Sequence, residues 1–340
     1  MIKVKISTSF KCEPIYLFRQ SPKRNGVWGD VQFFVNDDTL KECDYWVVYE
    51  GLSKIEKTFC PKENVYLITG EPPSIKGYKR FFLKQFVCVI TCHRDIKHKN
   101  KIYWQQAMPW HIGWRQTNPK NTEFSMDYDD LNFTREIQKT RLISVISSNK
   151  SKIKEQRDRL EFMFFLKEYF KDKIDLFGRG INEIEDKWDA IAPYKYHVVL
   201  ENSCYDDYFS EKLSDAFLGE AYPIYSGASN VYSYFSKDSL VCIDIKKPSV
   251  AVKIIETIMA NEFYEKYRAS IIKSKMKVLN EYNLFPTVLD KFINIDNNMS
   301  RAKMEIVLKP EQYYGFKGIE TRIGDSVKVI KKFTRADKNV

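Results

Sequence analysis

The sequence lacks any apolar run of about 18 residues, the length that a helix needs to cross a bilayer. Its first residues, MIKVKIST, alternate polar and apolar side chains as a short strand does, so we expect no secretory signal peptide. Internal repeats, heptad arrays and low-complexity tracts are also missing. These absences favour a cytoplasmic protein made of packed domains, and a length of 340 residues favours two of them.

The sequence also lacks the cysteine pattern of a disulfide framework, because its seven cysteines are scattered and odd in number. We therefore expect reduced thiols. Cys88, Cys92 and His93 approach the spacing of metal ligands, but no second pair follows, so no metal site is predicted. Two acidic pieces could be mistaken for metal-binding motifs and are predicted to be solvated or structural: Asp127, Asp129 and Asp130, and Asp206 and Asp207.

The chain has an excess of positive charge, with 55 Lys and Arg against 45 Asp and Glu. About half of this excess lies in residues 301–340. Such a balance suits an anionic partner, whether a nucleotide, a nucleic acid or an acidic membrane face, and it also suits a solubilising lysine-rich surface. The basic residues have no RNP-like, KH-like or helix-turn-helix context, which argues against a nucleic-acid partner.

The basic segment 301–340 has two interpretations. It either attaches the protein peripherally to the anionic inner face of the plasma membrane, or it packs back on the N-terminal domain as a strand or helix. Sedimentation with vesicles of differing lipid charge distinguishes them, because only the first interpretation requires binding that depends on anionic lipid and weakens with salt.

The remaining pattern alternates strands and helices. Apolar runs rich in Val, Ile and aromatic residues predict strands, and 3.6-residue periodicity predicts helices over 154–170 and 211–218 and a largely helical segment over 250–280. Nearly continuous apolar strands between helices indicate an α/β fold with doubly wound parallel sheets. The predicted strands are 2–7, 45–49, 65–69, 86–91, 142–146, 173–177, 196–200, 222–225 and 240–245.

The strand predicted at 196–200 ends unusually, in the polar and aromatic stretch ENSCYDDYFSEKL. Ser210 is a good helix N-cap, so Glu211 and Lys212 fall in the first helical turn. A helix N-terminus favours phosphate, and a lysine there is unfavourable unless an anionic ligand is near. Asn202 and Tyr208 flank the same strand end and suit a nucleotide diphosphate sugar. A capped helix with a solvated Glu-Lys pair is the alternative.

Three stretches carry a family resemblance. YKYHVVLENSCYDDYFSEKLSDAFLGEAYPIYSG resembles the donor-binding motif of the α-1,3/1,4-fucosyltransferases of the bacterial type, glycosyltransferase family 10, with Ser210 where the family usually has Thr. SSNKSKIKEQRDRLEFMFFLKEYFKDKIDLFGRG is similar to the segment with R-x-R, a helix and a strand ending F-G-R-G. VYLITGEPP resembles the short T-G-E motif. The resemblance covers roughly residues 60 to 270.

This resemblance implies a GT-B fold, in which two Rossmann-like domains face each other across a cleft. The expected domains are 1–138, which binds the acceptor, 139–300, which binds GDP-fucose, and 301–340, the basic tail. Residues 115–139 are interpreted as the connection. The implied reaction inverts the anomeric carbon of GDP-β-L-fucose on transfer to a glycan hydroxyl, in surface-glycan or lipopolysaccharide synthesis.

By motif position the resemblance implies that Glu71 is the general base. Arg157 and Lys212 would neutralise the pyrophosphate, and Arg159 takes the place of Arg157 if the helix begins later. No divalent metal or other cofactor is expected, because two cations already serve the diphosphate.

The resemblance also implies contacts with the rest of the donor. Glu211 and Asn202 would bind ribose or sugar hydroxyls, and Tyr208 would contact the diphosphate. A transferase of the same fold that uses another nucleotide sugar remains the alternative, followed by a basic nucleic-acid-binding protein.

Overall fold

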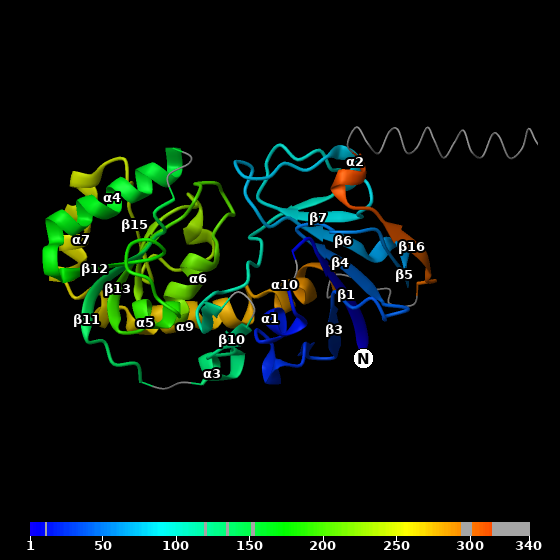
Figure 1. Cartoon of the computed structure of the whole chain (residues 1–340), viewed down its shortest axis with the longest axis horizontal. Helices are drawn as coiled ribbons and strands as arrows, with labels where there is room; N and C mark the ends of the chain where they lie inside the picture. Colours follow the sequence, from blue (N-terminus) through cyan, green and yellow to red (C-terminus); the bar gives the residue numbers. More distant parts are fainter. Residues whose placement is uncertain (11, 119–120, 134–135, 151–153, 294–300, 315–340) are drawn as a thin grey trace, which may run out of the picture. The chain divides into compact units, whose positions relative to one another are not determined.

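Short runs of β-branched and aromatic residues form the strands of two main sheets (Figure 1). The structure is a computed structural model, and it describes residues 1–10, 12–118, 121–133, 136–150, 154–293 and 301–314. The chain divides into two units. The first unit comprises Met1–Cys12, Phe33–Ile102 and Asn298–Val340, and the second comprises Glu13–Gln32 and Tyr103–Asn297.

The larger sheet has the strand order β2-β3-β1-β4-β6-β7-β8. Strands β1, β4, β6 and β7 lie in the first unit and run parallel, with all five residues of β4 buried. Phe82 and Leu83 of α2 pack into the same core as Trp46 and Val48 of β4. The bounds are β1 Ile2–Thr8, β2 Val27–Trp28, β3 Val31–Val35, β4 Tyr45–Tyr49, β6 Val65–Ile68, α2 Arg80–Leu83, β7 Cys88–Thr91 and β8 Lys101–Tyr103.

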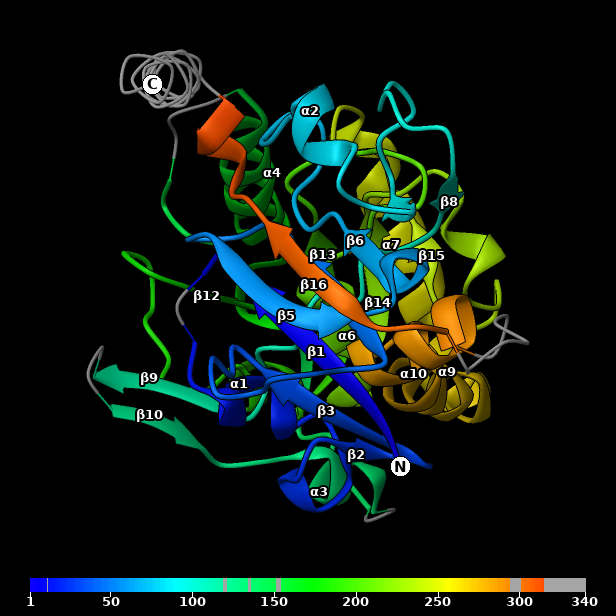
Figure 2. The same cartoon turned by 90° about the vertical axis from the view of Figure 1, so that its right-hand side faces the viewer.

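The described part of the C-terminal segment belongs to the first unit. Strand β16 (Met304–Leu308) pairs antiparallel with β5 (Glu56–Cys60), and Figure 2 shows the two strands side by side. A short 3-10 turn, η6 (Glu311–Tyr314), follows. The predicted membrane attachment of 301–340 concerns mainly residues 315–340, which lie outside the described residues, and it stays a prediction.

The second unit contains a five-stranded sheet in the order β12-β11-β13-β14-β15, and all its pairs are parallel. Helices α4 and α7 lie on one face and α5, α6 and α9 on the other (Figure 1). The bounds are β11 Arg141–Ile146, α4 Lys154–Phe170, β12 Ile174–Phe177, α5 Lys187–Ile191, β13 Tyr194–Leu200, α6 Glu211–Leu218, β14 Tyr222–Ser226, β15 Val241–Cys242, α7 Pro248–Ala260, α8 Phe263–Lys266, α9 Arg268–Asn280 and α10 Leu284–Val288.

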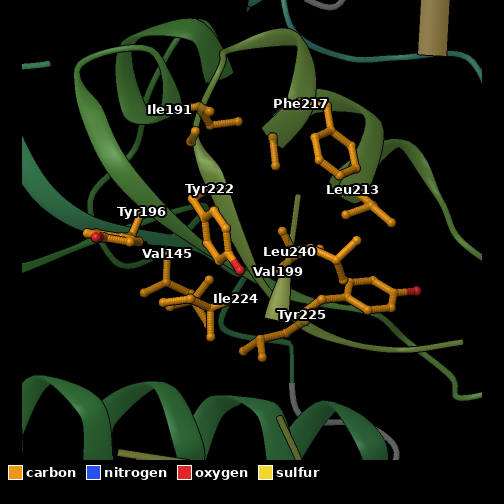
Figure 3. Packing of buried hydrophobic residues seen from close by; sticks show 14 of the residues in the cluster. Val145, Ile191, Tyr196, Val199, Leu213, Phe217, Tyr222, Ile224, Tyr225 and Leu240 are labelled. Atoms are coloured by element: carbon orange, nitrogen blue, oxygen red, sulfur yellow. The ribbon is translucent and has the colours of Figure 1, made fainter. Parts of the chain in front are cut away.

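The core of this unit is built on β13 and β14. Figure 3 shows Tyr222 and Ile224 of β14 near Tyr196 of β13 and Val145 of β11, and Leu213 and Phe217 of α6 belong to the same core. Because these strands are covered on both faces, their sequences are apolar throughout rather than alternating. The predicted helical segment 250–280 is interrupted between α7 and α8, where Glu262 has a left-handed φ of 49°.

The domain boundary differs from the prediction of 138/139. Residues 103–138 and 13–32 belong to the second unit, because Trp110 and Ile112 join its core. The fully buried Arg19 donates from Nη1 to the carbonyl of Ile112 at 3.0 Å. The segment 115–139, interpreted as a connection, contributes β9 (Trp114–Asn118), β10 (Asn121–Phe124) and α3 (Tyr128–Asn132); α1 (Pro14–Phe18) belongs to the second unit as well.

Among the described residues, no helix combines the length and apolar character that crossing a membrane requires.

Candidate functional site

Glu201 occupies the point where the central strand β13 ends. Its side chain is 0% exposed, and it accepts hydrogen bonds from the backbone N–H and the hydroxyl of Ser210, at 2.8 and 2.6 Å. Burial raises the pKa of the Glu201 carboxyl. The carboxyl group therefore anchors the start of α6 to the end of β13, which explains why this strand ends in an acidic residue.

Ser210 caps α6 as predicted, with its hydroxyl accepting from the backbone N–H of Lys212 at 3.3 Å. The ammonium of Lys212 lies 3.1 Å from Glu211 Oε1 and 3.8 Å from Glu201 Oε2. Burial opposes the charge of Lys212, but the two carboxylates raise its pKa above the ordinary value. A positive charge is thus held at the N-terminus of α6, where the helix dipole alone would disfavour it.

Glu211 is surrounded by basic groups. Its Oε1 lies 3.6 Å from Lys187 Nζ and 3.8 Å from His111 Nδ1, besides its contact with Lys212. Burial opposes ionisation, but Lys212 and Lys187 hold the pKa of Glu211 well below its usual range. Burial lowers the pKa of His111 to about 4, so its imidazole is neutral at pH 7. Glu211 is therefore an ionised hydrogen-bond acceptor beside a neutral imidazole.

Asp215 fixes Lys187 and His111 in place. It is fully buried one turn after Glu211 on α6, and it accepts from Lys187 Nζ at 2.7 Å. Its other oxygen accepts from the backbone N–H groups of His111 and Ile112, each at 2.9 Å. Sequence reasoning left Lys187, His111 and Asp215 out of the site. The i, i+4 spacing of Glu211 and Asp215 was the one available signal, because it places them on the same helix face.

The two candidate arginines of α4 lie in different environments. Arg159 is 7% exposed and its Nη1 donates to the carbonyl of Leu200, the last residue of β13, at 3.4 Å. Arg157 is exposed. Residues two apart on an α-helix point in different directions, so only one of them can face the sheet. The structure brings Arg159 to the end of β13, in place of the predicted Arg157.

Two glycines of the F-G-R-G stretch allow a close backbone approach. Gly178 has φ +131°, and a Cβ there would lie 1.9 Å from the carbonyl oxygen of Ser147. Gly180 has φ +74°, and its Cβ would lie 2.1 Å from Asn149 Nδ2. Only glycine fits both positions. They let the loop after β11 lie against the end of β12, so that Ser147 can line the pocket described next.

These groups surround a pocket of about 250 Å³ in the second unit. Three of the predicted site residues line it, namely Asn202, Glu211 and Lys212. Cationic and polar residues that also line it are Arg159, Lys187, Lys150, His111, Gln156 and Ser147. The pocket thus combines several cations with neutral and acidic hydrogen-bonding groups at the carboxyl ends of parallel strands, the usual ligand position in such sheets.

Two predicted site residues lie elsewhere. Tyr208 is 1% exposed and is not among the residues that line the pocket, so its position does not support the predicted contact with a diphosphate. Glu71 belongs to the first unit and follows β6 directly. It is half-buried, and its backbone carbonyl lies 2.9 Å from His93 Nε2.

Aspartates of the two acidic stretches, 127–130 and 206–207, form hydrogen bonds with groups of the protein itself. Asp127 is the N-cap of α3 in a reciprocal capping box with Asp130. Asp207 accepts from Asn230 Nδ2 at 2.8 Å and from the Tyr234 hydroxyl at 2.6 Å. Within the described part of the chain, no group of three or more His, Cys, Asp or Glu side chains is arranged to hold a metal ion.

Part of the second unit matches a known protein family. Residues 137–284 match the sequence profile "Glycosyltransferase family 10 (fucosyltransferase) C-term". A "4-galactosyl-N-acetylglucosaminide 3-alpha-L-fucosyltransferase 9" of Cricetulus griseus is 33% identical over 88 residues, and the Homo sapiens protein of that name is 32% identical over 88 residues. Each match covers 25% of this chain and 24% of the relative, so the chain aligns with about a quarter of these proteins.

The fold resembles that of a solved structure. A crystal structure of an alpha1,3-fucosyltransferase aligns with 88% of this chain and 91% of its own, with a TM-score of 0.50 and 17% sequence identity. At that identity the likeness concerns the fold alone. It confirms the predicted GT-B class.

Proposed function

We propose that the protein belongs to glycosyltransferase family 10, whose profile residues 137–284 match, and that it transfers L-fucose from GDP-β-L-fucose to a hydroxyl of a glycan acceptor. The proposal includes inversion at the anomeric carbon, an α-1,3/1,4-type linkage and a role in surface-glycan or lipopolysaccharide synthesis in the cytoplasm. The observation that carries it is the pocket at the end of β13, which gathers Arg159, Lys187 and Lys212 around hydrogen-bonding groups.

The leaving group of such a transfer is GDP, whose phosphates gain charge as the bond to the anomeric carbon breaks. Lys212 supplies a point charge and Arg159 a planar fork, so the two suit different oxygens of a diphosphate. Both are held by neighbouring groups, Lys212 by Glu201 and Glu211 and Arg159 by the carbonyl of Leu200. Because these charged groups are already in position, they would not have to move to stabilise the negative charge that develops on the departing GDP. This arrangement supports the proposed transfer.

The remaining polar groups suit the hydroxyls of the donor. Asn202 offers an amide, and the ionised Glu211 accepts hydrogen bonds from ribose or sugar hydroxyls. The neutral His111 beside Glu211 adds a group that donates without adding charge. Glu71 is the proposed general base: its carboxylate takes the proton of the acceptor hydroxyl as the oxygen bonds to the anomeric carbon, and the electron pair of the broken bond leaves with GDP.

A panel of nucleotide sugars tests the proposed donor. The protein is melted with GDP-fucose, GDP-mannose and UDP-galactose, and fucose transfer is assayed in parallel. GDP-fucose and GDP are expected to raise the melting temperature, because a ligand that binds only the folded state stabilises it. If only UDP-galactose raised the melting temperature, the protein would use a donor other than GDP-fucose. If none of the nucleotide sugars raised it, the proposal would be contradicted.

Replacing each of the two arginines by lysine, one at a time, tests which of them contacts the donor. Arg159→Lys is expected to weaken GDP binding by about tenfold or more, because a charge-assisted fork is replaced by a point charge. Arg157→Lys is the matched control, since it makes the same exchange two residues away on an exposed face, and it is expected to leave the dissociation constant within about twofold. Calorimetric titration with GDP measures both. If Arg157→Lys weakened GDP binding more than Arg159→Lys did, Arg157 would be the arginine that contacts the diphosphate, as the motif implied.

Metal removal tests the proposed charge neutralisation. We expect transfer to persist in excess EDTA, because Lys212, Arg159 and Lys187 supply three positive charges in one pocket. Complete loss of activity that Mg²⁺ or Mn²⁺ reverses would show that a cation completes the diphosphate site.

A further inference from the structure

Glu71, the proposed base, lies on a connection whose backbone is constrained on both sides. Gly70 precedes it, and a Cβ on Gly70 would lie 2.1 Å from Glu50 Oε1. Pro72 follows it, and a proline disfavours helical backbone angles for the residue before it. The carbonyl of Pro72 then accepts from the backbone N–H of Lys76 at 3.0 Å, which closes a turn. The side chain of Glu71 therefore begins from a closely defined stretch of backbone.

His93, which follows β7, contacts the backbone of Glu71. Its Nε2 lies 2.9 Å from the carbonyl oxygen of Glu71. A carbonyl oxygen only accepts hydrogen bonds, so Nε2 carries the proton in this contact. Burial lowers the pKa of His93 below its ordinary value, so the neutral imidazole, which has a single N–H, predominates at pH 7. The one N–H of the His93 ring is therefore used on Glu71.

His93 is itself held by groups at the ends of two neighbouring strands. Thr69, directly after β6, donates from its hydroxyl to the hydroxyl of Thr91, the last residue of β7, at 3.1 Å. The hydroxyl of Thr91 accepts from the backbone N–H of His93 at 3.0 Å, and all three residues are buried. The ring of Tyr78 contacts the imidazole in a T-shaped arrangement, with centroids 5.4 Å apart. His93 thus connects the sheet to both ends of the connection that carries Glu71.

We propose that His93 is a positioning residue for Glu71. Its Nε2–H fixes the backbone from which the Glu71 carboxylate takes the proton of the acceptor hydroxyl. The inference rests on the proposed function, because that function makes Glu71 the base. A misplacement of about 1 Å between reacting groups can lower a rate about 10²-fold, so a hydrogen bond that sets this backbone affects turnover. His93 acts through Glu71 and is not itself a catalytic group.

Two substitutions of His93 separate its hydrogen bond from its packing. His93→Phe keeps a ring beside Tyr78 and loses the N–H, and it is expected to lower kcat about 10- to 100-fold and to leave the KM for GDP-fucose within about twofold. His93→Gln can present an amide N–H near the place of Nε2 and is expected to restore most of the rate. Initial rates with GDP-fucose and N-acetyllactosamine, a 4-galactosyl-N-acetylglucosaminide like that in the names of the matched relatives, measure both.

His98→Phe is the matched control. It makes the same exchange in the first unit, at a histidine whose Nε2 lies 3.0 Å from the carbonyl oxygen of Phe86. The substitution removes a comparable hydrogen bond away from the connection that carries Glu71. It is expected to leave kcat within about twofold, whatever its effect on the melting temperature. A loss of kcat in His98→Phe as large as that in His93→Phe would contradict a specific role for His93.

Combining His93→Phe with Glu71→Gln distinguishes positioning from a general loss of structure. Because Glu71→Gln already lacks the base, adding His93→Phe to it is expected to lower kcat by less than about threefold. If His93→Phe merely reduced the fraction of folded protein, it would lower the rate of Glu71→Gln by the same factor as that of the unmodified protein. That result would overturn the proposal.

NMR spectra of the full-length protein labelled with ¹⁵N-histidine test the hydrogen bond without using activity. At pH 7 the His93 ring is expected in the neutral form with its proton on Nε2, and the loss of its signals in His93→Phe identifies them. A neutral ring with its proton on Nδ1 would overturn the inference and leave Glu71 as the proposed base. If instead the unmodified protein transfers no fucose, or Glu71→Gln keeps kcat within a few-fold, the proposed function falls, and the positioning role falls with it even where the proton is on Nε2.

Discussion

Replacing Glu71 by glutamine is expected to lower kcat by about 10²–10⁴-fold and to leave the affinity for GDP-fucose unchanged. Glutamine keeps the size of the side chain and loses the carboxylate that would accept the proton of the acceptor hydroxyl. Because Glu71 belongs to the first unit and the proposed donor pocket to the second, the change removes no group from that pocket. Initial rates at saturating donor, together with calorimetric titration of GDP-fucose, measure the two effects.

Glu63→Gln is the matched control for this experiment, because it makes the same exchange at an exposed position in the first unit. It is expected to keep full activity. Formate provides a second check: in Glu71→Ala, a small carboxylate that enters the space is expected to restore part of the rate. If Glu71→Gln reduces kcat by only a few-fold and lowers the melting temperature instead, Glu71 has a structural role in its turn.

Lys212→Ala is expected to weaken GDP binding by about 10- to 150-fold, since a charge-assisted hydrogen bond to phosphate contributes about 1.5–3 kcal/mol. The same contact strengthens as the leaving group gains charge, so kcat is expected to fall as well. The substitution also leaves the buried Glu201 without the nearby ammonium, which is expected to lower the melting temperature. Titration with GDP and initial rates at saturating donor measure the two functional effects.

Lys212→Arg separates the functional effect from the structural one. It keeps the positive charge beside Glu201 and Glu211, so it is expected to restore much of the stability, while its different shape restores less of the affinity for GDP. Lys195→Ala is the matched control, because that lysine pairs with Glu265 away from the pocket. Unchanged GDP affinity in a folded Lys212→Ala protein would refute the role of this pocket in phosphate binding.

The network around α6 explains why these effects should be large. Glu201 binds Ser210, Ser210 caps the helix, and Lys212 lies within reach of both Glu201 and Glu211. Each group is held by another, so the ammonium of Lys212 does not have to be ordered when the ligand binds. Glu201 therefore positions Lys212 through its buried carboxyl group, although Glu201 itself does not line the pocket.

Local features of this protein followed from the sequence. The helix predicted over 211–218 has the observed bounds, because Ser210 is its N-cap and Gly219 follows its last residue. The helix over 154–170 and four apolar strands of the second unit were also predicted to within two residues, since periodicity and β-branched content act over a few residues. The strand predicted over 240–245 is shorter in the structure, where β15 comprises only Val241–Cys242. The motif around Glu211 and Lys212 needed no tertiary information for the same reason: its residues are neighbours in the chain.

The tertiary structure decided what depends on distant contacts. Lys187 and His111 reach the pocket because Asp215 binds the ammonium of one and the backbone of the other, across separations that no local pattern records. Burial of α4 against the sheet selected Arg159 over Arg157. Residues 13–32 and 103–138 belong to the second unit, although both segments precede the predicted boundary at 138/139. Burial of their apolar side chains against the core of that unit accounts for this assignment. Hydrophobic burial is non-directional and independent of sequence separation, so the sequence determined the elements and the donor motif, whereas packing determined which distant side chains complete the site.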